Sequence, residues 1–114
     1  LYDYPASQAA LSRIRPGEPP VAERFELYMG GVELANGFHE LTDADEQRAR
    51  FQQDNRRRRS QGLPEVPMDD HLLAALAAGM PRCAGVALGV DRLLMVLQEI
   101  PHIQAAMAFP EERA

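Results

Sequence analysis

The sequence predicts an α+β fold, because segments with two-residue periodicity alternate with segments of helical spacing. Residues 24–36 alternate polar and apolar side chains on both sides of a Gly-Gly pair, which is the pattern of a β-hairpin. Residues 85–89 form a strand of small residues, and an apolar helical pattern follows over residues 91–97. With 114 residues, 46% of them hydrophobic, the chain fits at most one globular domain with a modest core.

The composition argues against a nucleic-acid-binding protein and against a membrane-spanning one. The 12 Lys and Arg residues against 17 Asp and Glu residues create no basic field for nucleic acid, which argues against tRNA as a partner. No long apolar run predicts a membrane span. Cys83 is the single cysteine, which excludes a disulfide framework and suits a reducing cytoplasm, and we expect it to be a small buried residue. The N-terminus resembles neither a signal peptide nor a translation start, so we expect a piece of a longer chain.

The elements before the hairpin are short. Residues 1–4 predict a strand that ends at Pro5, and the spacing of Ala10, Leu11 and Ile14 predicts a helix over residues 7–14. Residues 16–20 contain three prolines and a glycine, which predicts a loop.

The hairpin itself is predicted to turn at Gly30 and Gly31 through a two-residue primed turn. Strands joined in this way place Met29 opposite Val32, Tyr28 opposite Glu33 and Glu26 opposite Ala35. Glu26, Tyr28 and Glu33 then share one face, and the two carboxylates are diagonal neighbours.

Two helices are predicted between the hairpin and the small-residue strand. The first begins at a capping box of Thr42 and Asp45, runs to about Ser60 and is closed by Gly62. Its four adjacent arginines, residues 56–59, favour a solvated helix end, with a grip on an acidic partner as the alternative. Asp69 is expected to cap the second helix. Its leucines at positions 72, 73 and 76 are expected in the core, and residues 103–109 are expected to close the chain as a short helix or strand.

The segment GVALGVDR, residues 85–92, carries the pattern of an ATP site. Strand alternation puts Gly85, Ala87 and Gly89 on one face, where little stands between the backbone and a flat ring. Val86 and Leu88 then face a core. A helix begins next, and an arginine at position 92 near its positive end suits phosphate oxygens. The alternative is close packing of the strand on a neighbour, because the Gly-Lys-Ser/Thr ending of a phosphate loop is missing.

Acidic and polar residues of the hairpin supply further candidate ligands. Glu26 and Glu33 suit Mg²⁺, which prefers carboxylate and phosphate oxygens and keeps several waters, so two carboxylates suffice. Asn36, Phe38 and Glu40 suit lysine: an amide for the polar head, an aromatic wall for the methylenes and a carboxylate for the ammonium. Strict alternation puts these three on the face opposite Glu33, so a common pocket requires a bulge near residues 35–37, which a glycine at position 37 permits. The alternative leaves the phenylalanine in the core and the second glutamate on the surface.

The stretches ERFE, ELANGFHEL and GVALGVDR resemble the C-terminal part of the catalytic domain of class II aminoacyl-tRNA synthetases of the lysine type. The resemblance covers residues 1–114, and counterparts of the family's first two signature motifs are absent. DYPASQAAL, TDADEQRARF and GMPRCAGVALGVDR are similar to a truncated group within this family that attaches β-lysine to a lysine of translation elongation factor P. The resemblance implies an antiparallel sheet flanked by helices, a cytoplasmic location, a homodimer for the complete protein, and amino-acid activation by ATP with Mg²⁺.

Carried over onto this sequence, the family's functional residues fall on the candidates above. Glu26 and Glu33 match the residues that hold magnesium and nucleotide, and Arg92 matches the catalytic arginine on the ATP phosphates, with Gly89 beside it. Asn36, Phe38 and Glu40 match the lysine pocket.

Two departures from the synthetases bear on the substrate. Ala35 and Ala87 stand where the synthetases place glycine. The methyl group of Ala87 is expected to intrude on the ligand space, and one carbon shifts selectivity by roughly 1 to 3 kcal/mol. We therefore expect Ala87→Gly in a complete enzyme to move preference toward α-lysine. Unchanged relative kinetics for the two lysines would reject that hypothesis.

The sequence thus favours an ATP-dependent ligase that activates lysine or β-lysine as an acyl-adenylate and transfers it to elongation factor P. The chain alone is expected to be inactive, because half the charge stabilisation for adenylate formation is missing. One alternative is a lysyl-tRNA synthetase, which the two alanines and the acidic balance disfavour. Another is a non-catalytic module that binds ATP, an amino acid or a partner protein, against which the intact Glu26, Glu33 and Arg92 argue.

Overall fold

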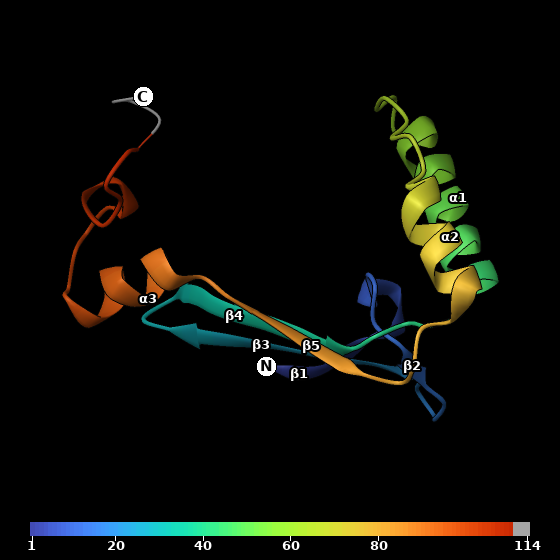
Figure 1. Ribbon diagram of the computed structural model, residues 1–114, viewed down its shortest axis with the longest axis horizontal. Helices are drawn as coiled ribbons and strands as arrows, with labels where there is room; N and C mark the ends of the chain where they lie inside the picture. Colours follow the sequence, from blue (N-terminus) through green and yellow to red (C-terminus); the bar gives the residue numbers. More distant parts are fainter. Residues whose placement is uncertain (111–114) are drawn as a thin grey trace. The chain divides into compact units, whose positions relative to one another are not determined.

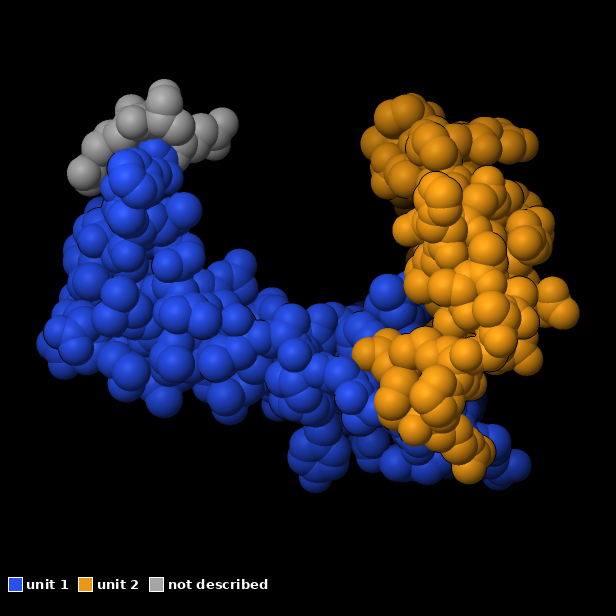
Figure 2. All heavy atoms as spheres, viewed as in Figure 1, with its two compact units in different colours: residues 1–39, 84–114 blue, residues 40–83 orange. Residues whose placement is uncertain are grey.

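The computed structural model describes residues 1–110, which form an antiparallel sheet and three α-helices (Figure 1). The α+β class and the antiparallel sheet are therefore confirmed. The chain divides into two compact units: unit 1 contains residues 1–39 and the chain from Ala84 on, and unit 2 contains residues 40–83 (Figure 2). Among the described residues, no helix combines the length and apolar character that a membrane span requires.

The sheet of unit 1 has the strand order β1-β3-β4-β5, and the short strand β2 also pairs with β3. Its strands are β1 (Tyr2–Pro5), β2 (Ile14–Arg15), β3 (Val21–Met29), β4 (Val32–His39) and β5 (Ala84–Leu88). Gly30 and Gly31 join β3 to β4 with φ angles of 58° and 80°, as the predicted primed turn requires. Helix α3 (Val90–Leu97) follows β5 and contacts β4.

The pairing of β3 with β4 contains a β-bulge. Tyr28 pairs with Glu33 as predicted, but the predicted pair of Glu26 with Ala35 is wrong, because Glu26 pairs with Asn36. Leu34 is the extra residue, since the register shifts there and Leu34 has no partner on β3. The bulge expected near residues 35–37 thus lies slightly earlier. It brings Glu33 and Asn36, three positions apart, to the same face.

The helix predicted over residues 7–14 is wrong. The chain forms only a 3₁₀ turn at Ala6–Gln8 and then enters β2. Ala10 has a φ angle of 51°, in the left-handed region that a right-handed helix cannot continue through. The strand predicted for residues 1–4 is confirmed as β1.

Unit 2 contains helices α1 (Ala44–Ser60) and α2 (Asp70–Gly79), which contact each other. The cap of α1 is Asp43 rather than the predicted Thr42, because the Asp43 carboxylate accepts from the backbone amides of Asp45 and Glu46 at 2.9 Å. Asp69 caps α2 as predicted, accepting from the amide of Leu72 at 2.9 Å. The buried side chains of the two helices are Gln47, Leu73 and Leu76.

The arginine run at the end of α1 is only partly a solvated helix end. Arg58 Nε donates to the carbonyl of Pro64 at 2.7 Å, and Arg59 forms an ion pair with Glu65 at 2.6 Å. Residues 63–68, which have no regular secondary structure, are further tied to α1 by Asn55, whose side-chain amide exchanges two hydrogen bonds with the backbone of Val66. We call residues 63–68 the strap.

The prediction that Val86 and Leu88 face a core is wrong among the described residues. These side chains are 65% and 50% exposed, and Leu27 and Phe25 on the same sheet face are 51% and 39% exposed. Register places all four on one face, because Leu27 and Leu88 both pair with Ala35, and Phe25 and Val86 both pair with Gly37. Cys83 is half-buried rather than buried.

Candidate functional site

The predicted site residues of the hairpin and of β5 lie on the other face of the sheet. Asn36 is the centre of one cross-strand row, with Glu26 on one side and Ala87 on the other. The next row places Arg24, Phe38 and Gly85 side by side. Polar groups of β3 and β4 therefore adjoin the small residues of β5 on one surface.

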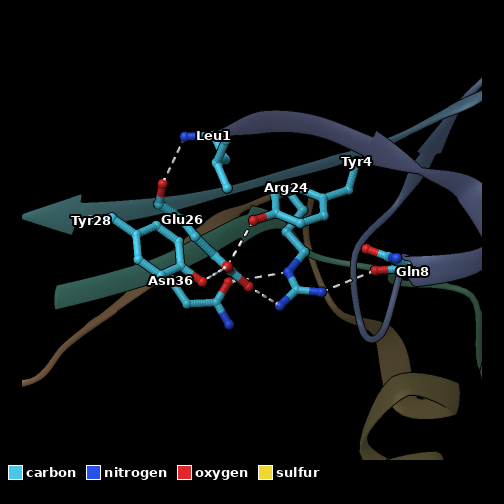
Figure 3. Close-up of polar contacts among 7 residues, drawn as sticks. All are labelled: Leu1, Tyr4, Gln8, Arg24, Glu26, Tyr28 and Asn36. Atoms are coloured by element: carbon cyan, nitrogen blue, oxygen red, sulfur yellow. Dashed lines mark hydrogen bonds and ion pairs between the residues drawn. The ribbon is translucent and has the colours of Figure 1, made fainter. Parts of the chain in front are cut away.

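Glu26 is the centre of a hydrogen-bonded cluster on this face (Figure 3). Only 8% of the residue is exposed. Its Oε2 atom accepts hydrogen bonds from the hydroxyl groups of Tyr4 at 2.7 Å and Tyr28 at 2.6 Å. Its Oε1 atom forms an ion pair with the guanidinium of Arg24. We call Tyr4, Arg24, Glu26 and Tyr28 the Glu26 cluster.

Electrostatics in the Glu26 cluster favour the ionised carboxylate. The hydrogen bonds from Tyr28 and Tyr4, followed by the charge of Arg24, lower the pKa of Glu26 against the opposing effect of desolvation. The hydrogen bond that Tyr4 donates to Glu26 is the chief cause that raises the pKa of Tyr4 to about 12. The pKa of Tyr28 is raised for the same reason, with a smaller contribution from the charge of Glu33.

Arg24 connects the Glu26 cluster to Asn36. Its Nε donates to Asn36 Oδ1 at 3.4 Å, a long hydrogen bond, and Nη1 donates to the carbonyl of Gln8 at 3.0 Å. The guanidinium also lies over the ring of Tyr4, 4.8 Å from its centroid, within the range of a cation–π contact. Sequence reasoning missed both Arg24 and Tyr4. The alternation of Arg24, Glu26 and Tyr28 along β3 was a usable signal for the arginine, whereas Tyr4 depends on the pairing of β1 with β3.

Glu33 and Arg92 lie at the turn end of the same hairpin. Glu33 is opposite Tyr28 on β4, so Tyr28 stands between the two predicted magnesium ligands. Arg92 Nη1 donates to the backbone carbonyl of Glu33 at 3.0 Å, and the amide of Gly89 donates to the carbonyl of Leu34 at 2.8 Å. Among the described contacts, Arg92 and Glu26 form no ion pair. The structure thus brings Arg92 to Glu33 and both glutamates to Tyr28.

A divalent ion fits this pair of glutamates only with ligands from elsewhere. The described residues contain no group of three His, Cys, Asp or Glu side chains that would hold a metal. A carboxylate has about four lone-pair sites, and three of those on Glu26 accept from Tyr4, Tyr28 and Arg24. One site on Oε1 remains, which suits a single bond to Mg²⁺ with phosphate and water oxygens completing the shell.

The predicted lysine pocket is only partly assembled within one unit. Asn36 and Phe38 are half-buried neighbours on the same face of β4. Glu40 is the first residue of unit 2, and its amide donates to the carbonyl of Cys83 at 3.0 Å. The grouping of Glu40 with Asn36 and Phe38 stays a prediction.

Known proteins are similar to this chain over almost all of its length. The family model of class II tRNA synthetases (D, K and N) matches residues 1–113. The chain is 59% identical over all 114 residues to the elongation factor P–(R)-β-lysine ligase of Vibrio cholerae serotype O1. It is 58% identical over 114 residues to the protein of the same name from Klebsiella pneumoniae subsp. pneumoniae. It is also 59% identical over 110 residues, 96% of this chain, to that of Photobacterium profundum. The chain spans about a third of the length of these relatives: 35% of the first two and 34% of the third.

Proposed function

Because this chain belongs to the family of class II tRNA synthetases (D, K and N), we propose that it forms part of an ATP-dependent ligase that modifies elongation factor P. The ligase activates lysine or β-lysine and transfers it to a lysine of that factor. The observation that carries the proposal is the shared sheet face, on which Glu26, Asn36 and Ala87 form one row. The names of the relatives, which specify (R)-β-lysine and elongation factor P, favour β-lysine as the substrate.

The reaction has two steps. The carboxylate of the amino acid attacks the α-phosphorus of ATP, and pyrophosphate leaves, so that an acyl-adenylate forms. The amine of the acceptor lysine then attacks the acyl carbon, AMP leaves, and an amide bond forms. Negative charge builds on phosphate oxygens in the first step, so fixed positive groups lower its barrier.

Each candidate residue has a role in this scheme. Arg92, at the first turn of α3, binds phosphate oxygens and stabilises their charge. Glu26 and Glu33 hold Mg²⁺, which when bound neutralises phosphate charge. A Cβ atom at Gly89 would lie 3.3 Å from Arg92 Cδ, so glycine at this position leaves the arginine side chain room beside the nucleotide.

The amino acid lies along the same face in this proposal. Asn36 binds its carboxylate end, Phe38 covers its methylenes, and Glu40 receives the side-chain ammonium. Ala87 is exposed and adjoins Asn36, so its methyl group borders the carboxylate end and influences the choice between α- and β-lysine. A cytoplasmic location and a homodimeric complete protein belong to the same proposal.

The test uses the full-length protein. Exchange of pyrophosphate into ATP, dependent on lysine or (R)-β-lysine, measures activation, and transfer to elongation factor P or to tRNA identifies the acceptor. We expect exchange with β-lysine and transfer to the factor. Arg92→Ala should reduce exchange by about tenfold or more, because each charge-assisted contact contributes about 1.5 to 3 kcal/mol, while Arg82→Ala at an exposed position serves as the control. Transfer to tRNA alone would identify a lysyl-tRNA synthetase, and absence of exchange would leave a non-catalytic module.

A further inference from the structure

We propose that Arg24 is a positioning residue that orients the Asn36 side-chain amide, so that Asn36 presents its Nδ2 amino group to the carboxylate of the amino-acid substrate. This inference rests on the proposed function, in which Asn36 binds that carboxylate.

The chemistry of Arg24 fixes which end of the amide faces it. A guanidinium has five N–H donors and no acceptor. The atom of Asn36 that lies 3.4 Å from Arg24 Nε is therefore the oxygen, since the amino group would face the guanidinium as a second donor. The amino group of Asn36 then points away from Arg24, and no described residue accepts a hydrogen bond from it.

Arg24 is itself held firmly enough to orient a neighbour. Its side chain is 18% exposed and is paired with Glu26. A second nitrogen donates to the carbonyl of Gln8, and the guanidinium lies over the ring of Tyr4. Figure 3 shows the guanidinium reaching both the Glu26 carboxylate and the Asn36 amide. Since these contacts come from three different residues, the Arg24 side chain is held in place without Asn36.

The two residues that flank Asn36 in its cross-strand row do not orient its side-chain amide as Arg24 does. Ala87, on one side of Asn36, has no polar side-chain atom. Glu26, on the other side, has a carboxylate that only accepts hydrogen bonds. Without Arg24, the amino group of Asn36 would turn toward Glu26, and the amide oxygen would face the substrate. An amide oxygen repels a substrate carboxylate, because neither group can donate. Arg24 thus keeps the amino group of Asn36 free for the substrate carboxylate, because without Arg24 the Glu26 carboxylate would compete for that amino group.

The test is a double-mutant cycle in the full-length protein. We expect Arg24→Gln to raise the KM for the amino acid, and its calorimetric Kd, by about tenfold or more, the size of a lost bond to a charged group. In an Asn36→Ala background the same substitution should change neither constant further. Arg15→Gln, which removes an exposed arginine paired with Asp3, is the matched control. Thermal unfolding reports whether each variant folds.

The outcomes separate this inference from the proposed function. If Arg24→Gln weakens amino-acid binding equally in the wild-type and in the Asn36→Ala background, Arg24 acts through Glu26 or through the fold, and the inference is overturned. Unchanged binding in Arg24→Gln overturns it as well. If the wild-type protein binds the amino acid with the expected cycle but supports no pyrophosphate exchange, the inference holds and the proposed function fails. If it binds neither lysine nor β-lysine, both fail.

Discussion

At Glu26, two phenol hydroxyls share one carboxylate oxygen while an arginine takes the other. The two phenols, more than the arginine, set the ionisation of this carboxyl, because their hydrogen bonds are the largest causes of its lowered pKa. A carboxylate with a lowered pKa in the folded state contributes stability that is fully present above the unfolded value, about 4.3. That contribution is lost as the pH falls through the lowered value.

Tyr28→Phe tests this account of Glu26. Removing the largest cause should raise the pKa of Glu26 toward its ordinary value, so the acid side of the stability profile should shift to higher pH. The measurement is the acid-unfolding midpoint of the full-length protein by circular dichroism. Tyr2→Phe, which alters an exposed tyrosine, is the control. An unchanged midpoint in Tyr28→Phe would show that the phenol does not stabilise the carboxylate.

Gly37 illustrates a residue whose importance the sequence indicated for a different reason. A Cβ atom at this position would lie 2.7 Å from Cε1 of Phe25 and 2.8 Å from the carbonyl oxygen of Gly85. We expect Gly37→Ala to destabilise the protein by about 1 to 3 kcal/mol, the usual effect of overpacking, measured by urea unfolding. Gly17→Ala, whose Cβ would meet nothing closer than 3.3 Å, should change the free energy of unfolding much less. Equal effects of the two substitutions would contradict the steric explanation.

Sequence periodicity predicted which residues of the hairpin matter but not all of their contacts. Alternation identified Glu26, Tyr28 and Glu33 as sharing a face, and the pairing of Tyr28 with Glu33 confirms that geometry. Tyr4 was missed because its contact with Glu26 spans 22 positions, and local pattern contains no information on which distant strand becomes a neighbour. The functional roles of these residues remain predictions.

Among the elements, the strands and α-helices were predicted best where their ends carry a chemical signal. Gly30 and Gly31 defined the hairpin turn, and Asp69 defined the start of α2. The helix expected over residues 7–14 failed because helical spacing of three apolar residues does not determine backbone dihedrals, and Ala10 adopts a positive φ angle. The cap of α1 lies one residue later than predicted, because Thr42 and Asp43 are both residue types that cap helices well.

The strap of unit 2 is held against α1 by side chains of Asn55, Arg58 and Arg59. The contribution of Asn55 to this attachment can be measured. Asn55 makes two hydrogen bonds to the backbone of Val66, at 2.8 and 2.9 Å. Asn55→Ala should cost about 1 to 3 kcal/mol in all, because each lost bond contributes about 0.5 to 1.5 kcal/mol. Hydrogen exchange should report it as faster exchange of the Val66 amide, and Gln53→Ala on the same helix is the control. Unaltered exchange at Val66 would mean that Arg58 and Arg59 hold the strap without Asn55.

For the whole molecule, the described residues leave an apolar sheet face and the free edge of β5 open to solvent. Val86 and Leu88, on that edge strand, are both at least half exposed, and such surfaces promote association. We expect residues 1–114 expressed alone to self-associate with increasing concentration in sedimentation velocity. Val86→Lys should reduce association, whereas Val66→Lys, at an exposed site of unit 2, should not. A monomer at all concentrations would show that the exposed apolar face and the β5 edge do not drive association.

Leu34, the bulged residue of β4, also affects the local shape of the hairpin. A strand that alternates strictly returns to the same side only at even intervals, yet Glu33 and Asn36 reach it across an odd one. Deleting Leu34 would place Glu33 and Asn36 two positions apart in a regular strand, so both side chains would stay on this face. The extra residue therefore does not select the face on which Glu33 lies, and its effect is the local bend and added twist that a bulge gives to the turn end of the hairpin.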